Sequence, residues 1–226
     1  MLVAFALVAA AAALPASSAR ATDSVCANAL GGAAVAGPSP AGSWRAGVGG
    51  RAAPWLLVLK RPRVAGGRCW IQVRLPRRPN DAAGWIDAAR VLVEQNRWRI
   101  EISTARRTVT LYRSGRPVRT MSAVVGAPGT PTPSGLFAVT WAIRWHPNDF
   151  LGSWVLELTA HSDVLQRFDG GDGTVAIHGR GGASLADPLG SALSHGCVRL
   201  SNDSIDWLVR TIGVDGLPGT VVRITG

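Results

Sequence analysis

The feature that most constrains the fold is a dense series of short runs, from residue 98 to the C-terminus, in which polar and apolar side chains alternate. Such alternation is typical of strands that bury one face. Turn signals such as Ser114-Gly115 separate the runs. The strand candidates are residues 99–103, 108–112, 118–125, 136–141, 154–159, 175–177 and 220–224. This half of the chain is therefore expected to be mainly β.

One segment, residues 201–212, has helical periodicity instead. Gly213 follows it directly, as is common after the last turn of a helix. Its apolar residues recur at the i, i+3, i+4 and i+7 spacing of one buried face: Ile205, Leu208, Val209 and Ile212. We expect a β-sandwich domain over residues 96–226 with one or two helices.

Upstream, residues 53–95 contain three further strand-like runs, at 55–60, 69–75 and 84–86, separated by turn signals. They predict a small all-β module, which would serve either as a structural spacer or as a ligand-binding unit. Residues 22–52 are rich in Ala, Gly, Ser and Pro, and this composition predicts a flexible linker.

The N-terminus has the pattern of a targeting segment. Residues 1–13 are almost entirely apolar, and Ala19-Arg20-Ala21 resembles an A-x-A cleavage signal, so residues 1–21 are interpreted as a signal peptide. No Lys or Arg precedes the apolar run, which departs from the usual pattern. An uncleaved anchor is the alternative, although the run is shorter than the ~20 apolar residues that span a bilayer. We expect an extracytoplasmic protein, secreted to the cell wall or periplasm, without stable membrane insertion after cleavage.

The chain is expected to be exported and has three cysteines, an odd number. An odd count predicts one disulfide and one free thiol. Cys26 and Cys69 are the natural pair, which leaves Cys197 free.

The charge balance limits the partners. The chain has 24 Lys and Arg against 14 Asp and Glu, a formal charge of +10, which favours polyanions such as nucleic acid, anionic lipid or anionic wall polymers. The arginines are scattered through strand-like segments, whereas nucleic-acid readers usually gather them on one element. We therefore expect no nucleic-acid partner.

Cys197 lies near two histidines. A thiol becomes a strong nucleophile when an imidazole takes its proton or when an electropositive setting lowers its pKa. His195 is two residues away, and His178 is 197 − 178 = 19 residues upstream. Spacing alone leaves the base undecided, and an inert buried thiol competes with a catalytic one. Metal ligation is not expected, because no Cys-x-x-Cys or His-x-x-x-His pattern supplies the further ligands.

A family resemblance narrows these alternatives. The string SHGCVRLSN at 194–202, with AIHG at 176–179, resembles the signature of the L,D-transpeptidase catalytic (YkuD) domain. The likeness runs from about residue 98 to 226 and includes VVGAPGTPTPSGLFAVT at 124–140. The upstream stretch 70–91 weakly resembles the Src-homology-3-like barrels of bacterial wall enzymes.

The resemblance implies a role for each motif residue. Cys197 is implied to be the nucleophile and His178 its base, with the Gly179 carbonyl orienting the imidazole. The backbone N–H groups at Gly196 and Cys197, with the His195 side chain, are implied to face an oxyanion. Three further residues are substrate-binding candidates: Ser194, Arg199 and His161. Ser194 and Arg199 are expected rather to brace the loop.

The implied reaction is acyl transfer between peptidoglycan stem peptides without a cofactor or metal. Cys197 would form a thioester with a tetrapeptide stem, and an amine of a neighbouring stem would then replace the sulfur. Two alternatives stay open: an L,D-carboxypeptidase that lets water take the acyl group, and a catalytically silent wall-binding protein held on anionic polymers.

Overall fold

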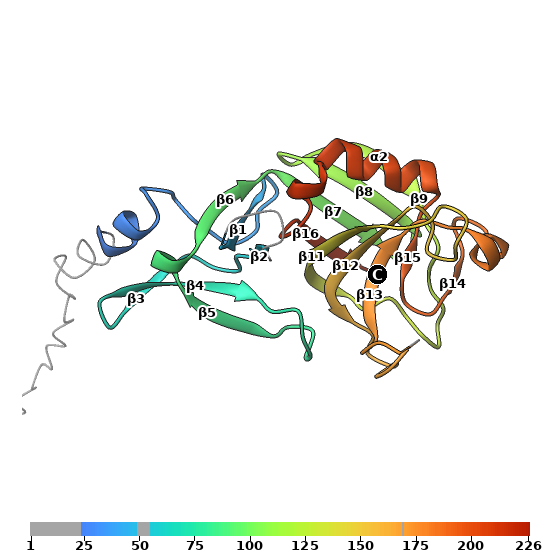
Figure 1. Cartoon of the computed structure of the whole chain (residues 1–226), viewed down its shortest axis with the longest axis horizontal. Helices are drawn as coiled ribbons and strands as arrows, with labels where there is room; N and C mark the ends of the chain where they lie inside the picture. The colour runs from blue at the N-terminus through green and yellow to red at the C-terminus, as the bar shows by residue number, and fades with distance from the viewer. Residues whose placement is uncertain (1–23, 49–54, 169) are drawn as a thin grey trace, which may run out of the picture.

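The structure, a computed structural model, describes residues 24–48, 55–168 and 170–226. A smaller N-terminal module and a larger C-terminal domain lie side by side (Figure 1). The expected signal peptide, residues 1–21, lies outside the described residues.

The N-terminal module is built from two three-stranded sheets. One has the order β2-β1-β6, with β1 at Ser43–Gly47, β2 at Trp55–Leu57 and β6 at Leu92–Asn96. The other has the order β3-β4-β5, with β3 at Arg63–Ala65, β4 at Arg68–Arg74 and β5 at Ala83–Asp87, followed by a 3-10 turn at Ala88–Arg90. A bridge between Val58 and Val73 joins the two sheets over a shared apolar core.

The expectation of a flexible linker over residues 22–52 is wrong for its described part. Residues 24–29 are helical, and Cys26 forms a disulfide with Cys69 of β4, with an S–S distance of 2.05 Å. Strand β1 pairs along its whole length with β6 and buries Ala46 in the module core. The Gly- and Pro-rich composition predicted flexibility, but the disulfide and the strand pairing make this segment part of the module.

The C-terminal domain contains one eight-stranded sheet of order β15-β13-β12-β11-β16-β7-β8-β9. It is mixed, because β13 runs parallel to β15 and β16 runs parallel to β7, while the other neighbours are antiparallel. Its strands are β7 Trp98–Ser103, β8 Thr108–Arg113, β9 Arg116–Ser122, β11 Gly135–Arg144, β12 Trp154–His161, β13 Thr174–His178, β15 Val198–Arg199 and β16 Val221–Thr225. A parallel pair, β10 Val125–Gly126 and β14 Ala192–Ser194, lies beside it.

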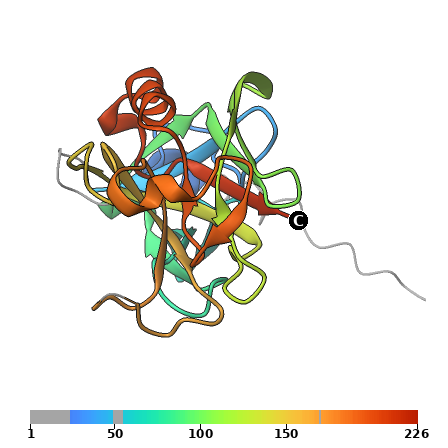
Figure 2. The same ribbon diagram turned by 90° about the vertical axis from the view of Figure 1, so that its right-hand side faces the viewer.

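This sheet curls around the main apolar core of the domain (Figure 1). The predicted helix is α2, Asn202–Ile212, and Ser201 caps it by accepting a hydrogen bond from the Ser204 N–H. Its buried residues Ile205, Leu208 and Val209 join the core, and Figure 2 shows the helix above the sheet, seen nearly end-on. The expected mainly β fold is confirmed. Two 3-10 turns complete it, at Gly182–Ala186 and Val214–Gly216.

One of the contacts between the module and the domain is made by the turn between β4 and β5. Arg78 donates hydrogen bonds to the carbonyl oxygens of Ser162 (2.7 Å), Leu165 (3.1 Å) and Asp172 (3.0 Å). Asn80 is paired with the backbone of His161 in both directions, at 2.8 and 2.7 Å. The module therefore holds both ends of the segment that joins β12 to β13.

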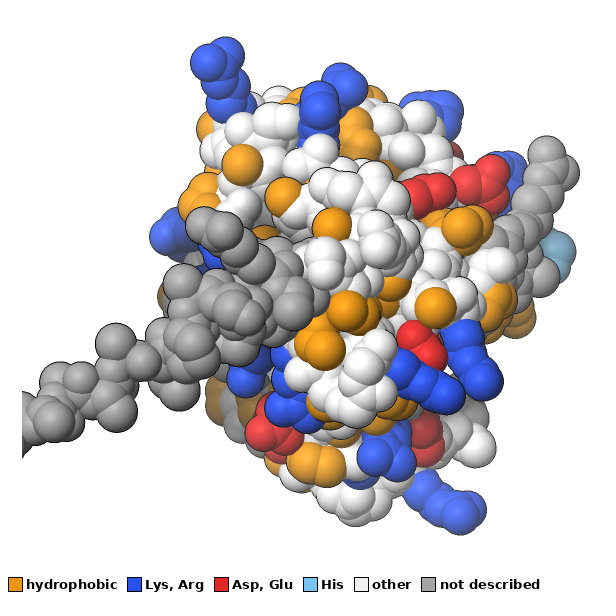
Figure 3. All heavy atoms as spheres, turned by 90° about the vertical axis from the view of Figure 1, so that its left-hand side faces the viewer, with side chains coloured by type: hydrophobic (Ala, Val, Ile, Leu, Met, Phe, Trp, Pro, Cys, Tyr) orange, Lys and Arg blue, Asp and Glu red, His pale blue; other side chains and the backbone are white. Residues whose placement is uncertain are grey.

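On the face of the module seen in Figure 3, Lys and Arg side chains are spread out and mixed with acidic and hydrophobic ones. Within the described part of the chain, we find no helix with the length and apolar character needed to cross a bilayer.

Candidate active site

Cys197 lies in a tight loop between β14 and β15. The Ser194 hydroxyl donates to the carbonyl oxygen of Cys197 at 2.6 Å and accepts from the Gly196 N–H at 3.2 Å, which closes the turn. Gly196 has a φ of +119°, a conformation that disfavours any residue with a Cβ. The buried Ser194 thus braces the loop, in line with the sequence expectation, and the structure does not bring its hydroxyl to the pocket surface.

A second segment supports this loop from outside. Thr132, 5% exposed, donates a hydrogen bond of 2.8 Å to the carbonyl oxygen of Gly196. Thr130 donates one of 3.1 Å to the carbonyl oxygen of Ser194. The proline-rich loop 127–134 therefore fixes the backbone that carries Cys197.

His178 ends β13 and is 1% exposed. It lies opposite Arg199 of β15 in the parallel register. Its Nδ1 atom is 2.8 Å from the carbonyl oxygen of Gly179. Since a carbonyl can only accept, this bond requires the proton on Nδ1 and leaves a lone pair on Nε2.

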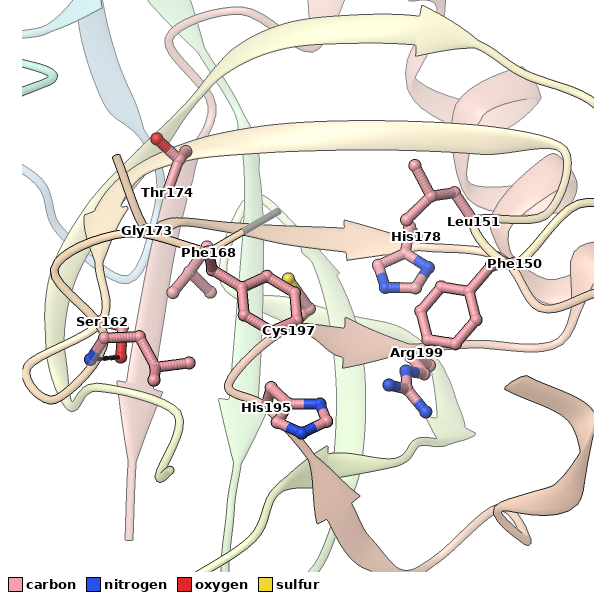
Figure 4. A pocket seen from close by; sticks show the side chains of 12 residues that line it. Phe150, Leu151, Ser162, Phe168, Gly173, Thr174, His178, His195, Cys197 and Arg199 are labelled. Carbon is pink, nitrogen blue, oxygen red and sulfur yellow. Dashed lines mark hydrogen bonds between the residues drawn. The ribbon is translucent and has the colours of Figure 1, made fainter. Parts of the chain in front are cut away.

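His178 and Cys197 line the same narrow pocket, with a cavity volume of about 60 Å³ (Figure 4). Its wall is mostly apolar, and the segment joining β12 to β13 supplies one side of it. The lining residues are Phe150, Leu151, Ser162, Leu165, Phe168, Gly173, Thr174, Val175, His178, His195, Cys197 and Arg199. The space admits a few water-sized groups, so only the reacting part of a peptide fits within it.

Burial acts on both reactive groups. Desolvation lowers the pKa of His178 to about 4, against the smaller opposing effects of the Gly179 and Leu151 backbone, and the charge of Arg199 acts in the same direction as desolvation. Burial also raises the pKa of the Cys197 thiol, against the smaller opposing effects of the Ala176 N–H and Arg199, even though the residue keeps partial contact with solvent. At neutral pH the pair is therefore a neutral imidazole and a neutral thiol.

His195 lies elsewhere on the pocket rim. Its side chain is exposed and stacks on Phe168, with ring centroids 5.2 Å apart. It comes from the loop that carries Cys197, while His178 comes from the sheet (Figure 4). The two histidines are thus distinguished by burial, and only His178 has a hydrogen bond that fixes its tautomer in the described structure.

Arg199 is 4% exposed and already paired. Its Nη1 lies 2.5 Å from the Oδ2 atom of Asp187, and its guanidinium lies 4.7 Å from the centroid of the Phe150 ring. Its Nε atom has no hydrogen-bond partner among the described residues. Arg199 therefore lies at the edge of the pocket with its charge neutralised by Asp187 and its side chain held in place.

His161, the third substrate-binding candidate, does not line the Cys197 pocket. It is buried at the end of β12, where its Nε2 lies 3.1 Å from Asp172, and it lines a neighbouring cavity with Trp55, Trp141 and Glu157. Thr174 is common to both cavities.

Sequence reasoning missed the aromatic and aliphatic lining. Phe150, Leu151 and Phe168 come from irregular segments that carry no periodic pattern. Asn202 was within the motif string, but nothing in its spacing gave it a role. As for metals, the described residues contain no group of three or more His, Cys, Asp or Glu able to hold an ion.

Comparison with known proteins gives one family. Residues 97–224 match the family model of the L,D-transpeptidase catalytic domain, YkuD. No curated protein matches the sequence. The matched residues begin after the N-terminal module, so the likeness of that module to Src-homology-3-like barrels stays a prediction.

Several solved structures are similar to this chain. An L,D-transpeptidase mutant from Enterococcus faecium is 18% identical, with 57% of this chain and 50% of that chain covered and a TM-score of 0.42. Residues 123–326 of the enzyme from Xylanimonas cellulosilytica are 25% identical, covering 57% and 61%, with a TM-score of 0.41. An L,D-transpeptidase from Mycobacterium tuberculosis H37Rv is 16% identical, covering 85% and 95%, with a TM-score of 0.48. The chain thus spans half the length of the Enterococcus protein.

Proposed function

The chain belongs to the L,D-transpeptidase catalytic domain (YkuD) family, and we propose that it is a cysteine acyltransferase of peptidoglycan stem peptides. One observation carries the proposal. His178 and Cys197 line the same pocket, and the Gly179 carbonyl holds the His178 tautomer whose Nε2 can accept a proton. A neutral imidazole in the same pocket as a neutral thiol is the starting state that general-base attack requires.

In the first step, Nε2 of His178 takes the thiol proton as the sulfur attacks a peptide carbonyl, proposed to be that of the third residue of a tetrapeptide stem. The Cys197 N–H is the proposed donor to the resulting oxyanion, because the Gly196 N–H already donates to Ser194. The C–N bond then breaks, the imidazolium returns the proton to the departing D-Ala amine, and a thioester remains.

In the second step, an amine of a neighbouring stem attacks the thioester and gives a proton to His178. The C–S bond breaks, and the sulfur regains its proton from the imidazolium. The products are one new amide bond and free D-Ala. No cofactor enters either step.

The apolar wall supports transfer over hydrolysis. Phe150, Leu165 and Phe168 shelter a cavity of about 60 Å³, which limits the water available to a thioester. The carboxypeptidase alternative would need water to compete in this space. A silent wall-binding role would give no reason for a fixed His178 tautomer beside Cys197.

We propose an extracytoplasmic location, in the cell wall or periplasm. The Cys26–Cys69 disulfide supports it, since such bonds persist in oxidising compartments. Anionic wall polymers are a further proposed partner on the basis of the net charge of +10.

Intact-protein mass spectrometry tests the proposal. Incubation with a tetrapeptide stem or a carbapenem should add one acyl group to the wild-type chain and none to Cys197→Ala. Addition of a stem amine should discharge the acyl group as a cross-linked product, whereas discharge only to water would favour the carboxypeptidase. Acylation of Cys197→Ala at the wild-type rate would rule out Cys197 as the nucleophile.

A further inference from the structure

Asn202, the first residue of α2, hydrogen-bonds three backbone groups around the active site. Its Oδ1 atom accepts from the N–H groups of Ser153 and Arg180, both at 3.0 Å. Its Nδ2 atom donates to the carbonyl oxygen of Pro147 at 3.0 Å. Two donors facing one side-chain atom and an acceptor facing the other leave a single orientation for this amide.

One of these contacts reaches the base through a single peptide group. The Arg180 N–H belongs to the same peptide group as the Gly179 carbonyl, and this carbonyl accepts the hydrogen bond from His178 Nδ1 at 2.8 Å. A peptide group is planar, so its N–H and C=O directions are fixed relative to each other. A hydrogen bond at the N–H end therefore sets the direction of the carbonyl at the other end.

The surrounding backbone leaves space for this side chain. A Cβ added to Gly179 would lie 2.2 Å from the Asn202 Oδ1 atom, and one added to Gly152 would lie 2.3 Å from it. Both distances are shorter than any van der Waals contact, so Asn202 can approach this closely only because both positions are glycine. The fit restricts the Gly179–Arg180 peptide group to one position.

We propose that Asn202 is a positioning residue, which keeps the Gly179 carbonyl directed at His178 Nδ1 and thereby keeps Nε2 available to Cys197. The role rests on the proposed acyltransfer function, because it describes how the base of that reaction is held. Asn202 does not line the pocket and acts only through the peptide group.

A purely structural role, anchoring α2 to the loop before β12, is the competing explanation, and the chain offers a matched control for it. Asp206, one turn further along the helix, accepts a hydrogen bond of 2.7 Å from the Ser153 hydroxyl. Asp206→Ala would loosen the same anchor without touching the Gly179–Arg180 peptide group. Asn202→Asp is the conservative variant, because it keeps an acceptor oxygen for the Arg180 N–H.

The tautomer of His178 is the primary measurement, made by ¹⁵N NMR of the imidazole ring at neutral pH. We expect a protonated Nδ1 and an unprotonated Nε2 in the wild-type chain, in Asp206→Ala and in Asn202→Asp, and a mixture of tautomers in Asn202→Ala. An unchanged tautomer in Asn202→Ala would overturn the proposal, as would a mixture in Asp206→Ala. If Asn202→Ala does not fold, loss of the tautomer in Asn202→Asp would overturn it instead.

Acylation kinetics give the second measurement. We expect kcat for acylation by a tetrapeptide stem to fall about tenfold to a hundredfold in Asn202→Ala, comparable to loss of the partner that orients a metal-bound histidine, with KM little changed. Equal losses of kcat in Asn202→Ala and Asp206→Ala would mean that Asn202 only anchors α2 and does not position His178. The NMR measurement needs no substrate, so a wild-type chain that fails to acylate would contradict the proposed function while the tautomer still tests Asn202.

Discussion

The guanidinium of Arg199 and the carboxylate of Asp187 form an ion pair at the pocket edge, with Nη1 2.5 Å from Oδ2. Arg199 is almost fully buried, whereas the Asp187 side chain is 29% exposed, so the pair neutralises a cation that water scarcely reaches. Burial is the main cause of the lowered pKa of His178, and the charge of Arg199 lowers it further. Asp187 thus holds in place a cation that acts on the pKa of His178, the proposed base.

Asp187→Asn should destabilise the fold by about 1.5–3 kcal/mol, the range for loss of a hydrogen bond to a charged group. Urea unfolding monitored by tryptophan fluorescence measures this loss. Asp149→Asn, which removes an exposed carboxylate from a nearby loop, is the control and should change stability by less than about 0.5 kcal/mol. Equal effects of the two substitutions would show that the Arg199 pair contributes nothing.

The buried imidazole predicts how activity and stability depend on pH. The pKa of His178 is about 4 in the folded chain and about 6.5 when unfolded, so the unfolded state binds more protons between these values. Stability should therefore fall as pH drops from about 6.5 to 4, by roughly 3 kcal/mol from this group. The acylation rate should also fall below pH 4, because the imidazolium cannot accept the thiol proton.

His178→Asn is the control for this pH dependence. Its Nδ2 can still donate to the Gly179 carbonyl, but it does not titrate. Unfolding midpoints measured from pH 4 to 7 should vary less steeply in this variant than in the wild-type chain. Identical slopes would mean that another group causes the acid sensitivity.

The two histidines of the pocket should differ in alkylation of Cys197 by iodoacetamide at neutral pH. His178→Ala removes the buried imidazole that we propose as the base, and it should slow the reaction by about a hundredfold or more. His195→Ala removes an exposed ring stacked on Phe168 and should change the rate by at most about threefold. If His195→Ala instead gives the larger loss, His195 is the base and the assignment of His178 is wrong.

The module-to-domain contact of Arg78 should affect the pocket from a distance. Arg78→Ala removes three hydrogen bonds to the segment that lines one side of the Cys197 pocket, whereas Arg77→Ala removes an exposed neighbour whose side chain makes no such contact in the described structure. We expect faster amide hydrogen exchange in residues 162–168 and 170–173, and a raised KM for the stem peptide, in Arg78→Ala alone. Equal exchange rates in the two variants would contradict this effect of Arg78 on the pocket and would leave the module with the role of a structural spacer.

The strands of the domain and α2 could be predicted from the sequence, because their apolar residues recur with periods of 2 and 3.6, and these periods can be recognised without knowledge of the tertiary structure. For segment 22–52 the prediction was wrong. Its described part is ordered by a disulfide and by pairing with a strand about 50 residues away, and local composition does not reveal either. The motif indicated Cys197, His178 and Gly179 as site candidates, and the structure brings all three to one place.

The environment of these residues could not be read in the same way. The pKa of His178 depends on burial, and burial depends on Phe150 and Leu151, which arrive from an irregular loop. Asn202 can form its hydrogen bonds only because two glycines on other segments leave space for its side-chain amide. Side-chain contacts of this kind follow from the closed fold, and no linear spacing encodes them.

The raised pKa of the Cys197 thiol should slow its oxidation in an oxidising compartment, the kind of environment in which the Cys26–Cys69 disulfide can persist. Peroxides and small disulfides react with thiolates, and a sulfur that keeps its proton until a carbonyl is in position gives them little to attack. The same apolar wall that limits water also limits access of these oxidants. The proposed nucleophile, Cys197, should therefore form sulfenic acid and mixed disulfides only slowly during the interval between substrates.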